Sequence, residues 1–254
     1  MRKFTTGLAL LAFAAGAFAS PVFTATGTAS CGDSEDAQAA FVFGTGTLQV
    51  QLTNLNDEIH SACSAISDLS FSLADSNGNT ITGGTEGLFS GQEITVNSTA
   101  TGADGGWSFG NTLTDDPWAF TAGTATTLYT LEGLGAGSNG PEDTLIGPPV
   151  GGLYVSTAAY SDANASIFTD SHNPHLGGTI VFSFAIPGVD SSTQVSSAIF
   201  SFGTDAGVTL DGTCTGDCGG GGGGLELTPE PSSVVLGGIG LLGLLLLKRR
   251  YSHS

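Results

Sequence analysis

The chain has 254 residues, of which 40 are glycine and 11% are charged, and its formal net charge at pH 7 is −18. Residues 20–247 contain no Lys or Arg, which excludes nucleic acid as a partner because phosphate binding depends on these side chains. The 40% hydrophobic content argues against wholesale disorder, and the low charge with abundant glycine is typical of extracellular all-β proteins.

The chain begins with the three parts of a secretory signal peptide. Arg2 and Lys3 form a positive n-region, residues 8–18 form an apolar h-region, and residues 17–19 form a small-x-small cleavage site. The sequence therefore predicts a cleaved signal peptide over residues 1–19. A retained N-terminal anchor is the less favoured alternative, because the apolar run is short for a membrane span.

Residues 20–213 are predicted to form an ectodomain, either one β-domain or two small ones. Short stretches that alternate apolar and polar residues predict its strands, as where Leu48, Val50 and Leu52 alternate with polar neighbours. The predicted strands are residues 40–43, 47–55, 66–73, 93–98, 106–109, 126–131, 153–160, 179–186 and 195–202. No amphipathic helix of standard length is predicted. Many short strands with Gly-rich turns favour an all-β fold, a β-sandwich or jelly roll.

A turn in the first half of the ectodomain raises the question of calcium binding. Residues 66–82 predict a hairpin, because their Asn-Gly dipeptide is a strong turn signal. Asp75, Asn77, Asn79 and Glu86 stand at positions 1, 3, 5 and 12 of a calcium-loop-like pattern. Glycine is missing at position 6 and the flanks resemble strands, so a plain turn is favoured and a weak calcium site is the alternative.

The four cysteines are Cys31, Cys63, Cys214 and Cys218. An even number of cysteines in an exported chain favours disulfides, and three pairings are open in principle. Spacing favours Cys31 with Cys63 and Cys214 with Cys218. A zinc site is less favoured because no matching second Cys pair lies near Cys214 and Cys218, and no Cys-x-x-Cys predicts a redox centre.

No motif predicts catalysis, and we expect a protein that is not an enzyme. Neither a Gly-x-Ser-x-Gly elbow nor a His-Glu-x-x-His motif occurs. His172 and His175, with Asp170 nearby, could bind a metal on a loop, although a polar surface turn is favoured. The acidic pairs at residues 115–116 and 142–143 would suit a glycosidase, but solvated carboxylates are the favoured interpretation.

Three aromatic residues are candidates for a sugar-stacking face. Trp107, Trp118 and Tyr129 could present their rings to a saccharide, but a role in the hydrophobic core is the favoured interpretation.

The C-terminal region divides into a linker and an apolar tail. Residues 214–227 contain six consecutive glycines and form a Cys/Gly-rich flexible linker. Residues 234–247 contain only Val, Leu, Ile and Gly. A helix over residues 232–247 would be roughly 24 Å long, close to the ~30 Å hydrocarbon core. The sequence predicts a single transmembrane helix, with the basic residues after it in the cytoplasm and the body outside.

Residues 228–254 resemble the PEP-CTERM sorting signal of exported bacterial proteins. The parts that carry the resemblance are, in order, Pro229, Glu230 and Pro231, the apolar residues 234–247, and the basic stop Lys248, Arg249 and Arg250. The resemblance implies that a membrane enzyme, exosortase, recognises the tail and cuts near Pro-Glu-Pro. The body would then be released or attached to the cell surface or its exopolysaccharide. Residues 43–54 and 195–204 also resemble strand motifs of PEP-CTERM ectodomains.

Two functional hypotheses follow. The first is a non-enzymatic exported protein that contributes structurally to the cell surface or the exopolysaccharide matrix. The second is a carbohydrate- or calcium-dependent binding module, such as an adhesin, with the same address. Exposed aromatic residues in a groove, or a clustered acidic pocket, would favour the second hypothesis.

Overall fold

The computed structural model describes residues 20–218 except residues 30, 58, 98–105, 135–140, 150–152, 155–157, 161–162, 170, 205–207 and 217. The predicted signal peptide, most of the linker, the sorting tripeptide, the transmembrane helix and the basic stop lie outside the described residues. The chain divides into units of residues 1–220 and 221–254, and only the first contains described residues. Within the described part, no helix has the length and apolar character that crossing a membrane requires.

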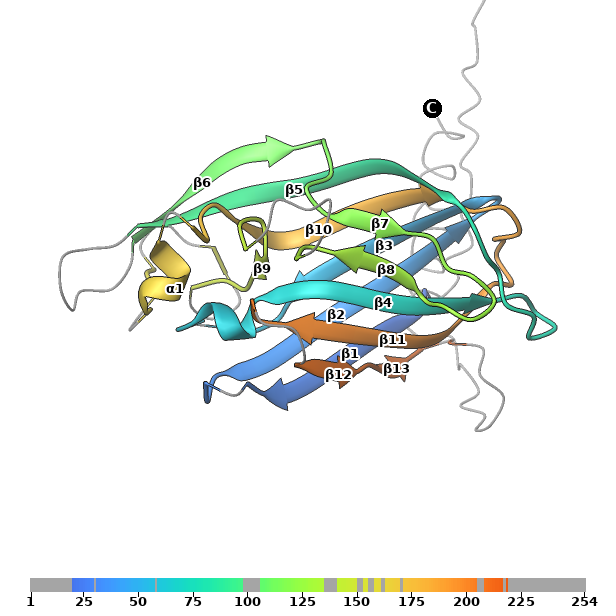
Figure 1. Cartoon of the computed structure of the whole chain (residues 1–254), viewed down its shortest axis with the longest axis horizontal. Coiled ribbons are helices and arrows are strands. Elements are labelled where there is room, and N and C mark those ends of the chain that lie inside the picture. The colour runs from blue at the N-terminus through green and yellow to red at the C-terminus, as the bar shows by residue number, and fades with distance from the viewer. Residues whose placement is uncertain are drawn as a thin grey trace, which may run out of the picture. The chain divides into compact units, whose positions relative to one another are not determined.

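The described part consists mainly of β-strands, which confirms the all-β prediction (Figure 1). The strands are β1 Val22–Thr28, β2 Ser34–Gly44, β3 Thr47–Asn54, β4 Ile66–Ala74, β5 Thr85–Asn97, β6 Gly106–Leu113, β7 Ala119–Thr121, β8 Tyr129–Glu132, β9 Leu145–Ile146, β10 His175–Ala185, β11 Gln194–Phe202, β12 Thr209–Asp211 and β13 Thr213–Thr215. The helical elements described are the 3-10 turn η1 (Ala62–Ser64) and the one-turn helix α1 (Ala165–Phe168).

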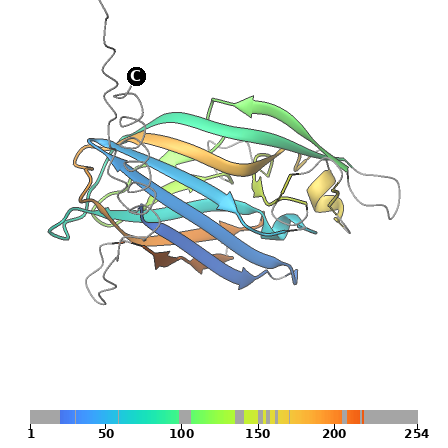
Figure 2. The same cartoon turned by 180° about the vertical axis from the view of Figure 1, so that it is seen from behind.

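Hydrogen bonds join the strands into one open sheet with two groups of antiparallel strands (Figures 1 and 2). One group runs β13-β1-β2-β3-β10-β5-β6, and the other runs β12-β11-β4-β8-β7. The short β9 pairs with both β10 and β4 and so connects the two groups. Ring centroids of Phe41 and Phe71 lie 5.2 Å apart, and those of Phe120 and Phe184 lie 4.6 Å apart. The two groups therefore face each other across a shared aromatic core.

Alternation of apolar and polar residues explains why these segments are strands. Side chains along a strand point to opposite faces in turn, so every second residue enters the core. In β3, Leu48, Val50 and Leu52 are buried, and in β10 the same holds for Ile180 and Phe182. The predicted strands at residues 47–55, 179–186 and 195–202 agree with β3, β10 and β11 within a few residues.

Gly212 connects the two groups of strands. β12 and β13 stand at opposite ends of the strand order, yet only Gly212 separates them in sequence. A Cβ atom at this position would lie 2.9 Å from the Phe200 ring and 3.1 Å from the Ala198 carbonyl oxygen. Only glycine fits this close approach, because any side chain would push against the core.

Several strand predictions were wrong in extent or pairing. The turn predicted within residues 66–82 exists, because Asp75 N–H donates to the Asn79 carbonyl and Ala74 pairs with Thr80. The second limb of this hairpin is short and ends at Ile81, whose N–H donates to the Leu73 carbonyl at 2.9 Å. Gly83 and Gly84 have φ values of 75° and 119°, and the chain then enters β5, which pairs with β10. β4 pairs instead with β11 and β8.

Other differences concern element boundaries. β1 and the first six residues of β2 were not predicted, since their small Ala, Gly and Thr residues give a weak apolar signal. The strand predicted at 126–131 begins at Tyr129. In the stretch predicted as strand 153–160, Leu153 and Tyr160 are single bridge residues, and residues 155–157 lie outside the described part.

A second, smaller core includes residues of η1 and α1. Both helical elements lie at one end of the strands (Figure 1). This core comprises Ile59, Ala62, Ala65, Ile94, Val96, Ile146, Tyr160 and Ile167. Trp107 and Tyr154 pack against this core from the surface. This end of the molecule carries the features described next.

Candidate functional site

Two disulfides are present, Cys31–Cys63 and Cys214–Cys218, in the pairing that the spacing favoured. The first ties the turn between β1 and β2 to η1. The second closes a short loop after β13. Cys31–Cys63 matters for the site because a polar pocket opens beside it.

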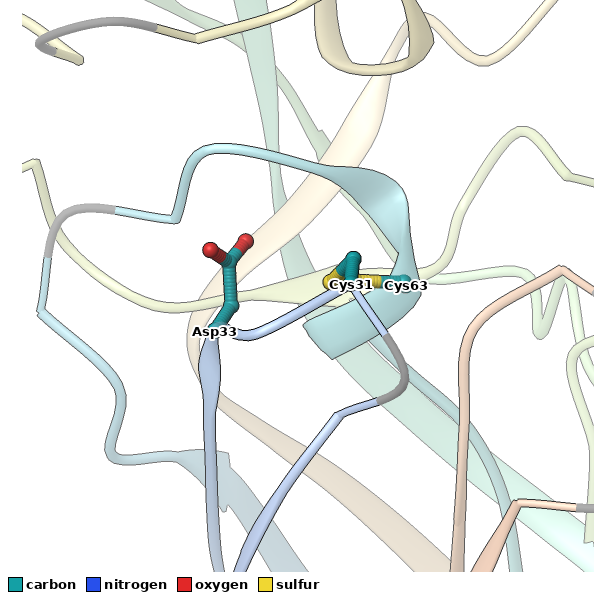
Figure 3. Close-up of side chains that lie close together, drawn as sticks. All are labelled: Cys31, Asp33 and Cys63. Atoms are coloured by element: carbon teal, nitrogen blue, oxygen red, sulfur yellow. A yellow bond between two sulfur atoms is a disulfide. The ribbon is translucent and has the colours of Figure 1, made fainter.

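Figure 3 shows the Asp33 side chain beside the Cys31–Cys63 disulfide. The carboxylate and the two sulfur atoms all lie within 4.8 Å of one another. Two cysteines and an aspartate at this distance resemble a thiolate metal site, but metals bind the thiolate form of cysteine. Because the two sulfurs form a disulfide, neither is a thiolate, and Asp33 is the one residue of these three that can bind a metal ion.

The pocket beside this disulfide has a volume of about 180 Å³. It is lined by Gly32, Asp33, Ser34, Asn56, Asp57, Ile59, His60 and Ser64. The lining comes from the start of β2, from the loop that follows β3, and from η1. Polar side chains that are distant in sequence therefore meet where these strands end.

A network of buried amides holds the loop after β3 in place. The Asn54 amide donates to the carbonyl oxygens of Ser64 and Leu145, both at 2.9 Å. Its own side-chain oxygen accepts from Asn56 N–H at 3.0 Å. The Asn56 amide donates to the same Ser64 carbonyl at 3.3 Å. Because these residues are buried, their hydrogen bonds position the Asn56 side chain firmly at the pocket wall.

Two side-chain oxygens that belong to lining residues remain unsatisfied. Asp33 Oδ2 and Asn56 Oδ1 are both buried and have no hydrogen-bond partner among the described residues. The other oxygen of Asp33, Oδ1, lies 3.2 Å from Nδ1 of His60, whose side chain is 44% exposed. Buried polar atoms are almost always paired, so two unpaired oxygens at one pocket call for an explanation.

An aromatic surface lies at the edge of the strand group that ends in β6. Trp107 and Phe109, two residues apart, share a face of β6, and Tyr154 packs against both. Ring centroids of Trp107 and Phe109 lie 4.8 Å apart. We call Trp107, Phe109 and Tyr154 the aromatic surface. Phe109 is 56% exposed, so this surface presents an apolar ring to solvent.

Hydrogen bonds fix the other two rings of the aromatic surface. Trp107 Nε1–H donates to the Ala158 carbonyl at 3.0 Å. The Tyr154 hydroxyl donates to the Ile146 carbonyl and accepts from Gly178 N–H, both at 2.9 Å. Burial raises the pKa of Tyr154 to about 12, so its hydroxyl remains protonated at neutral pH. The rings therefore form a preorganised platform.

Trp118 and Tyr129, the other two candidates for sugar binding, belong to the core. Trp118 is 2% exposed and donates from Nε1 to the Asp143 carbonyl at 2.9 Å. Tyr129 is 1% exposed, and its hydroxyl donates to the Ile81 carbonyl at 3.2 Å. Of the three residues, only Trp107 lies at the surface that carries Phe109. The sequence offered no reason to single out Phe109 or Tyr154, because aromatic residues in strands are usually buried.

The structure does not bring the four calcium-loop candidates together. Asp75 accepts at Oδ1 from the N–H groups of Asn77 and Asn79, each at 2.8 Å, and at Oδ2 from the Asn79 amide at 2.9 Å. Its carboxylate thus stabilises the turn. These hydrogen bonds lower the pKa of Asp75. Glu86 lies in β5, where its carboxyl group is next to Asp116.

Burial raises the pKa of three carboxyl groups in the described part of the chain, Glu35, Asp68 and Asp116. Burial raises the pKa of Asp116 to about 8, and its neighbour Glu86 contributes in the same direction. Burial also raises the pKa of Asp68 to about 6, with a smaller contribution from the negative charge of Glu132. Asp116 Oδ1 accepts from Trp118 N–H at 2.9 Å. Asp68 and Asp116 each lie next to another acid, in a body without Lys or Arg to neutralise them.

The histidine pair weighed for metal binding is part of the structure. A surface turn was favoured, but this is wrong for His175, which is fully buried. His175 Nε2–H donates to the Ile167 carbonyl at 2.9 Å, and Nδ1 lies 3.1 Å from the Thr144 hydroxyl. His172 is half-buried, and its Nδ1 lies 3.1 Å from the Thr169 hydroxyl. Asp170 lies outside the described residues.

Burial of His175 predicts a loss of stability in acid. Burial lowers its pKa to about 4, whereas the unfolded chain binds this proton near pH 6.5. As the pH falls from 6.5 toward 4, only the unfolded state gains the proton, so stability falls. Between pH 7.5 and 4.5, we expect this group to remove about 2–3 kcal/mol from the free energy of unfolding.

Denaturant unfolding at both pH values tests this expectation by comparing the native chain with His175→Gln. The raised pKa values of Asp68 and Asp116 change stability in the opposite direction, but they are common to both chains and cancel in the difference. The gap in stability between the native chain and the variant should narrow by about 2–3 kcal/mol on acidification. A gap of constant size would contradict the assignment.

Comparison with known protein families identifies the C-terminal segment. A family model for the PEP-CTERM protein-sorting motif matches residues 227–250. These residues carry a PEP-CTERM sorting motif. The match confirms the resemblance drawn from the Pro-Glu-Pro tripeptide, the apolar stretch and the basic stop, all of which lie within it. The chain has no significant match among curated proteins or among solved structures.

The PEP-CTERM motif indicates the route of the protein. It implies export, processing by an exosortase-type enzyme and association with the cell surface. The motif covers the tail and does not include the β-rich body. Any function of the body must therefore be argued from its own residues.

Proposed function

We propose that this protein is a non-enzymatic, exported structural component of the cell surface or of its exopolysaccharide matrix. The observation that carries the proposal is the PEP-CTERM motif at residues 227–250. The all-β body agrees with it, because the body contains two disulfides, which suit an extracellular environment. Its strong negative charge keeps the released body soluble through self-repulsion.

The aromatic surface favours a second candidate, a carbohydrate-binding module or adhesin with the same address. Saccharide rings carry apolar C–H faces that pack on exposed aromatic rings, which combine a large contact area with rigidity. Phe109 is exposed beside Trp107 and Tyr154, which are held by hydrogen bonds to the backbone. Trp107 and Phe109 also lie on β6, which among the described strands pairs with β5 alone, so its other edge could meet a long polymer.

Binding of the mature protein to exopolysaccharide tests both candidates. The secreted protein would be purified from a producing strain and sedimented with polysaccharide extracted from the same cells. We expect Phe109→Ala to weaken binding about 5- to 10-fold, because one aromatic contact contributes about 1–1.5 kcal/mol. Leu88→Ala is the matched control, since Leu88 is 77% exposed on β5 and belongs to no aromatic cluster of the described residues.

The outcomes separate the two candidates. Weaker binding by Phe109→Ala alone supports a saccharide-binding platform. Equal binding by the native chain and both variants contradicts the platform but agrees with a structural role in the matrix. A native protein that remains in the supernatant contradicts association with the matrix altogether.

A further inference from the structure

The pocket beside the Cys31–Cys63 disulfide has the chemistry of a cation site. Asp33 Oδ2 and Asn56 Oδ1 are buried oxygens without a hydrogen-bond partner in the described part of the chain. Asn56 is 3% exposed, so its oxygen is removed from bulk solvent and faces only what the pocket contains. Burying an unpaired acceptor is unfavourable, and an ionised carboxylate adds to that penalty. A bound cation would satisfy both oxygens at once.

We propose that this pocket binds a divalent cation, and that calcium is the ion that fits it. The donor atoms expected there are the oxygens of Asp33 and Asn56, with the carboxylate of Asp57 and the hydroxyl of Ser34 in the same lining. Calcium takes six to eight oxygen ligands in flexible geometry, from carboxylates, amide carbonyls and water.

The size and ligand types of the pocket favour calcium over other ions. A volume of about 180 Å³ accommodates an ion together with several of its waters. Zinc prefers thiolate and imidazole ligands, but the two cysteines are oxidised to a disulfide and His60 is the single histidine of the lining. Magnesium requires a rigid octahedron and retains its own water more strongly.

Electrostatics of the body point in the same direction. Residues 20–247 contain no Lys or Arg, so no Lys or Arg side chain of the body competes for the Asp33 carboxylate. The basic group next to Asp33 in the pocket is His60, whose Nδ1 lies 3.2 Å from Asp33 Oδ1. Asp33 Oδ2 has no hydrogen-bond partner among the described residues, so it is available to bind a cation. A strongly negative molecule also raises the local concentration of divalent cations.

The site would link segments that are distant in sequence. Asp33 precedes β2, and Asn56 follows β3, where the buried Asn54 and Ser64 fix its position. A cation between them would hold the ends of two neighbouring strands together, beside the covalent link of Cys31 to η1. Binding would therefore require the folded state and would stabilise it. This inference does not depend on saccharide binding at the aromatic surface.

Calcium titration of the mature, disulfide-bonded protein tests the proposal. After removal of metals with EGTA, binding would be measured by isothermal titration calorimetry and melting by calorimetric scanning. We expect one ion per chain with a Kd of about 10⁻⁴–10⁻³ M, as in extracellular modules. At 10 mM calcium, the Tm should rise by about 3–10 °C.

Variants with the same change of charge locate the site. Asp33→Asn should weaken calcium binding at least tenfold and abolish most of the Tm shift. Asp211→Asn removes one carboxylate from exposed β12, away from the pocket lining, and should leave both unchanged. Asp57→Asn, on the exposed side of the pocket, replaces Asp33→Asn if that variant does not fold.

Three results would overturn the proposal. Calcium binding that is equal in the native chain and in the folded pocket variant would exclude the pocket as the site. If sodium chloride of matched ionic strength raised the Tm as much as calcium does, the stabilisation would be explained by charge screening and not by a calcium site. Equal shifts with magnesium and calcium would overturn the assignment to calcium.

Discussion

Replacing Phe71 with alanine is expected to lower the free energy of unfolding by about 3–5 kcal/mol. Phe71 lies in β4 and is fully buried. Its ring contacts Phe41 of the opposing strand group at 5.2 Å between centroids and stacks on Tyr129 at 5.3 Å. Truncation removes contacts on both sides, and the surrounding strands cannot close the cavity because they are hydrogen-bonded to one another.

Thermal and denaturant unfolding of Phe71→Ala measures this effect. Phe109→Ala is the matched control, since it removes the same atoms from a side chain that is 56% exposed. We expect that control to cost below about 1 kcal/mol. A loss of about 3–5 kcal/mol corresponds to a Tm lower by roughly 6–20 °C for a domain of this size. Similar losses in the two variants would show that the two groups of strands do not share a tight core.

Replacing the Pro-Glu-Pro tripeptide with alanines is expected to block processing of the tail. The change removes Pro229, Glu230 and Pro231, which lie in the matched sorting motif. A proline restricts its own φ and disfavours the helical conformation in the preceding residue, and alanine does neither. Alanines would allow a helix to continue and would remove the acidic group.

Intact mass and location of the protein in a producing strain measure this effect. The native chain should have a mass that begins at Ser20 and ends near Pro231, in the envelope or the medium. The alanine variant should retain residues 232–254 and remain in the membrane fraction. Alanine at Leu225 and Glu226, outside the matched residues, should leave processing unchanged. A native chain that retains its tail would mean that the motif is unused in that host.

Local periodicity allowed the central strands to be predicted from the sequence. In β3, large apolar residues alternate with polar ones, and β10 and β11 show the same alternation over part of their length, so each strand was located within a few residues. This signal fails in β1, which was not predicted, and is weak in β6, of which only residues 106–109 were predicted. β1 alternates small residues, and β6 exposes most of its side chains at an edge, so neither shows a strong apolar face.

The pairing of the strands could not be predicted from the sequence. The turn after β4 was recognised, but the partners of β4 are β11 and β8, which lie more than 50 residues away in the chain. A turn signal is local, whereas pairing depends on which buried faces fit together. The same reason applies to His175, whose polar sequence neighbours suggested a surface turn although the ring is fully buried.

The sequence by itself determined the sorting signal of this protein and the class of its fold. The sorting motif is a contiguous segment, and alternation and composition are also properties of neighbouring residues, so all three can be read without a structure. Only the tertiary structure decided the candidate sites. Asp33 meets Asn56, and Phe109 meets Tyr154, because strand pairing and the packing of loops against the second core bring distant residues together. No local pattern records such contacts.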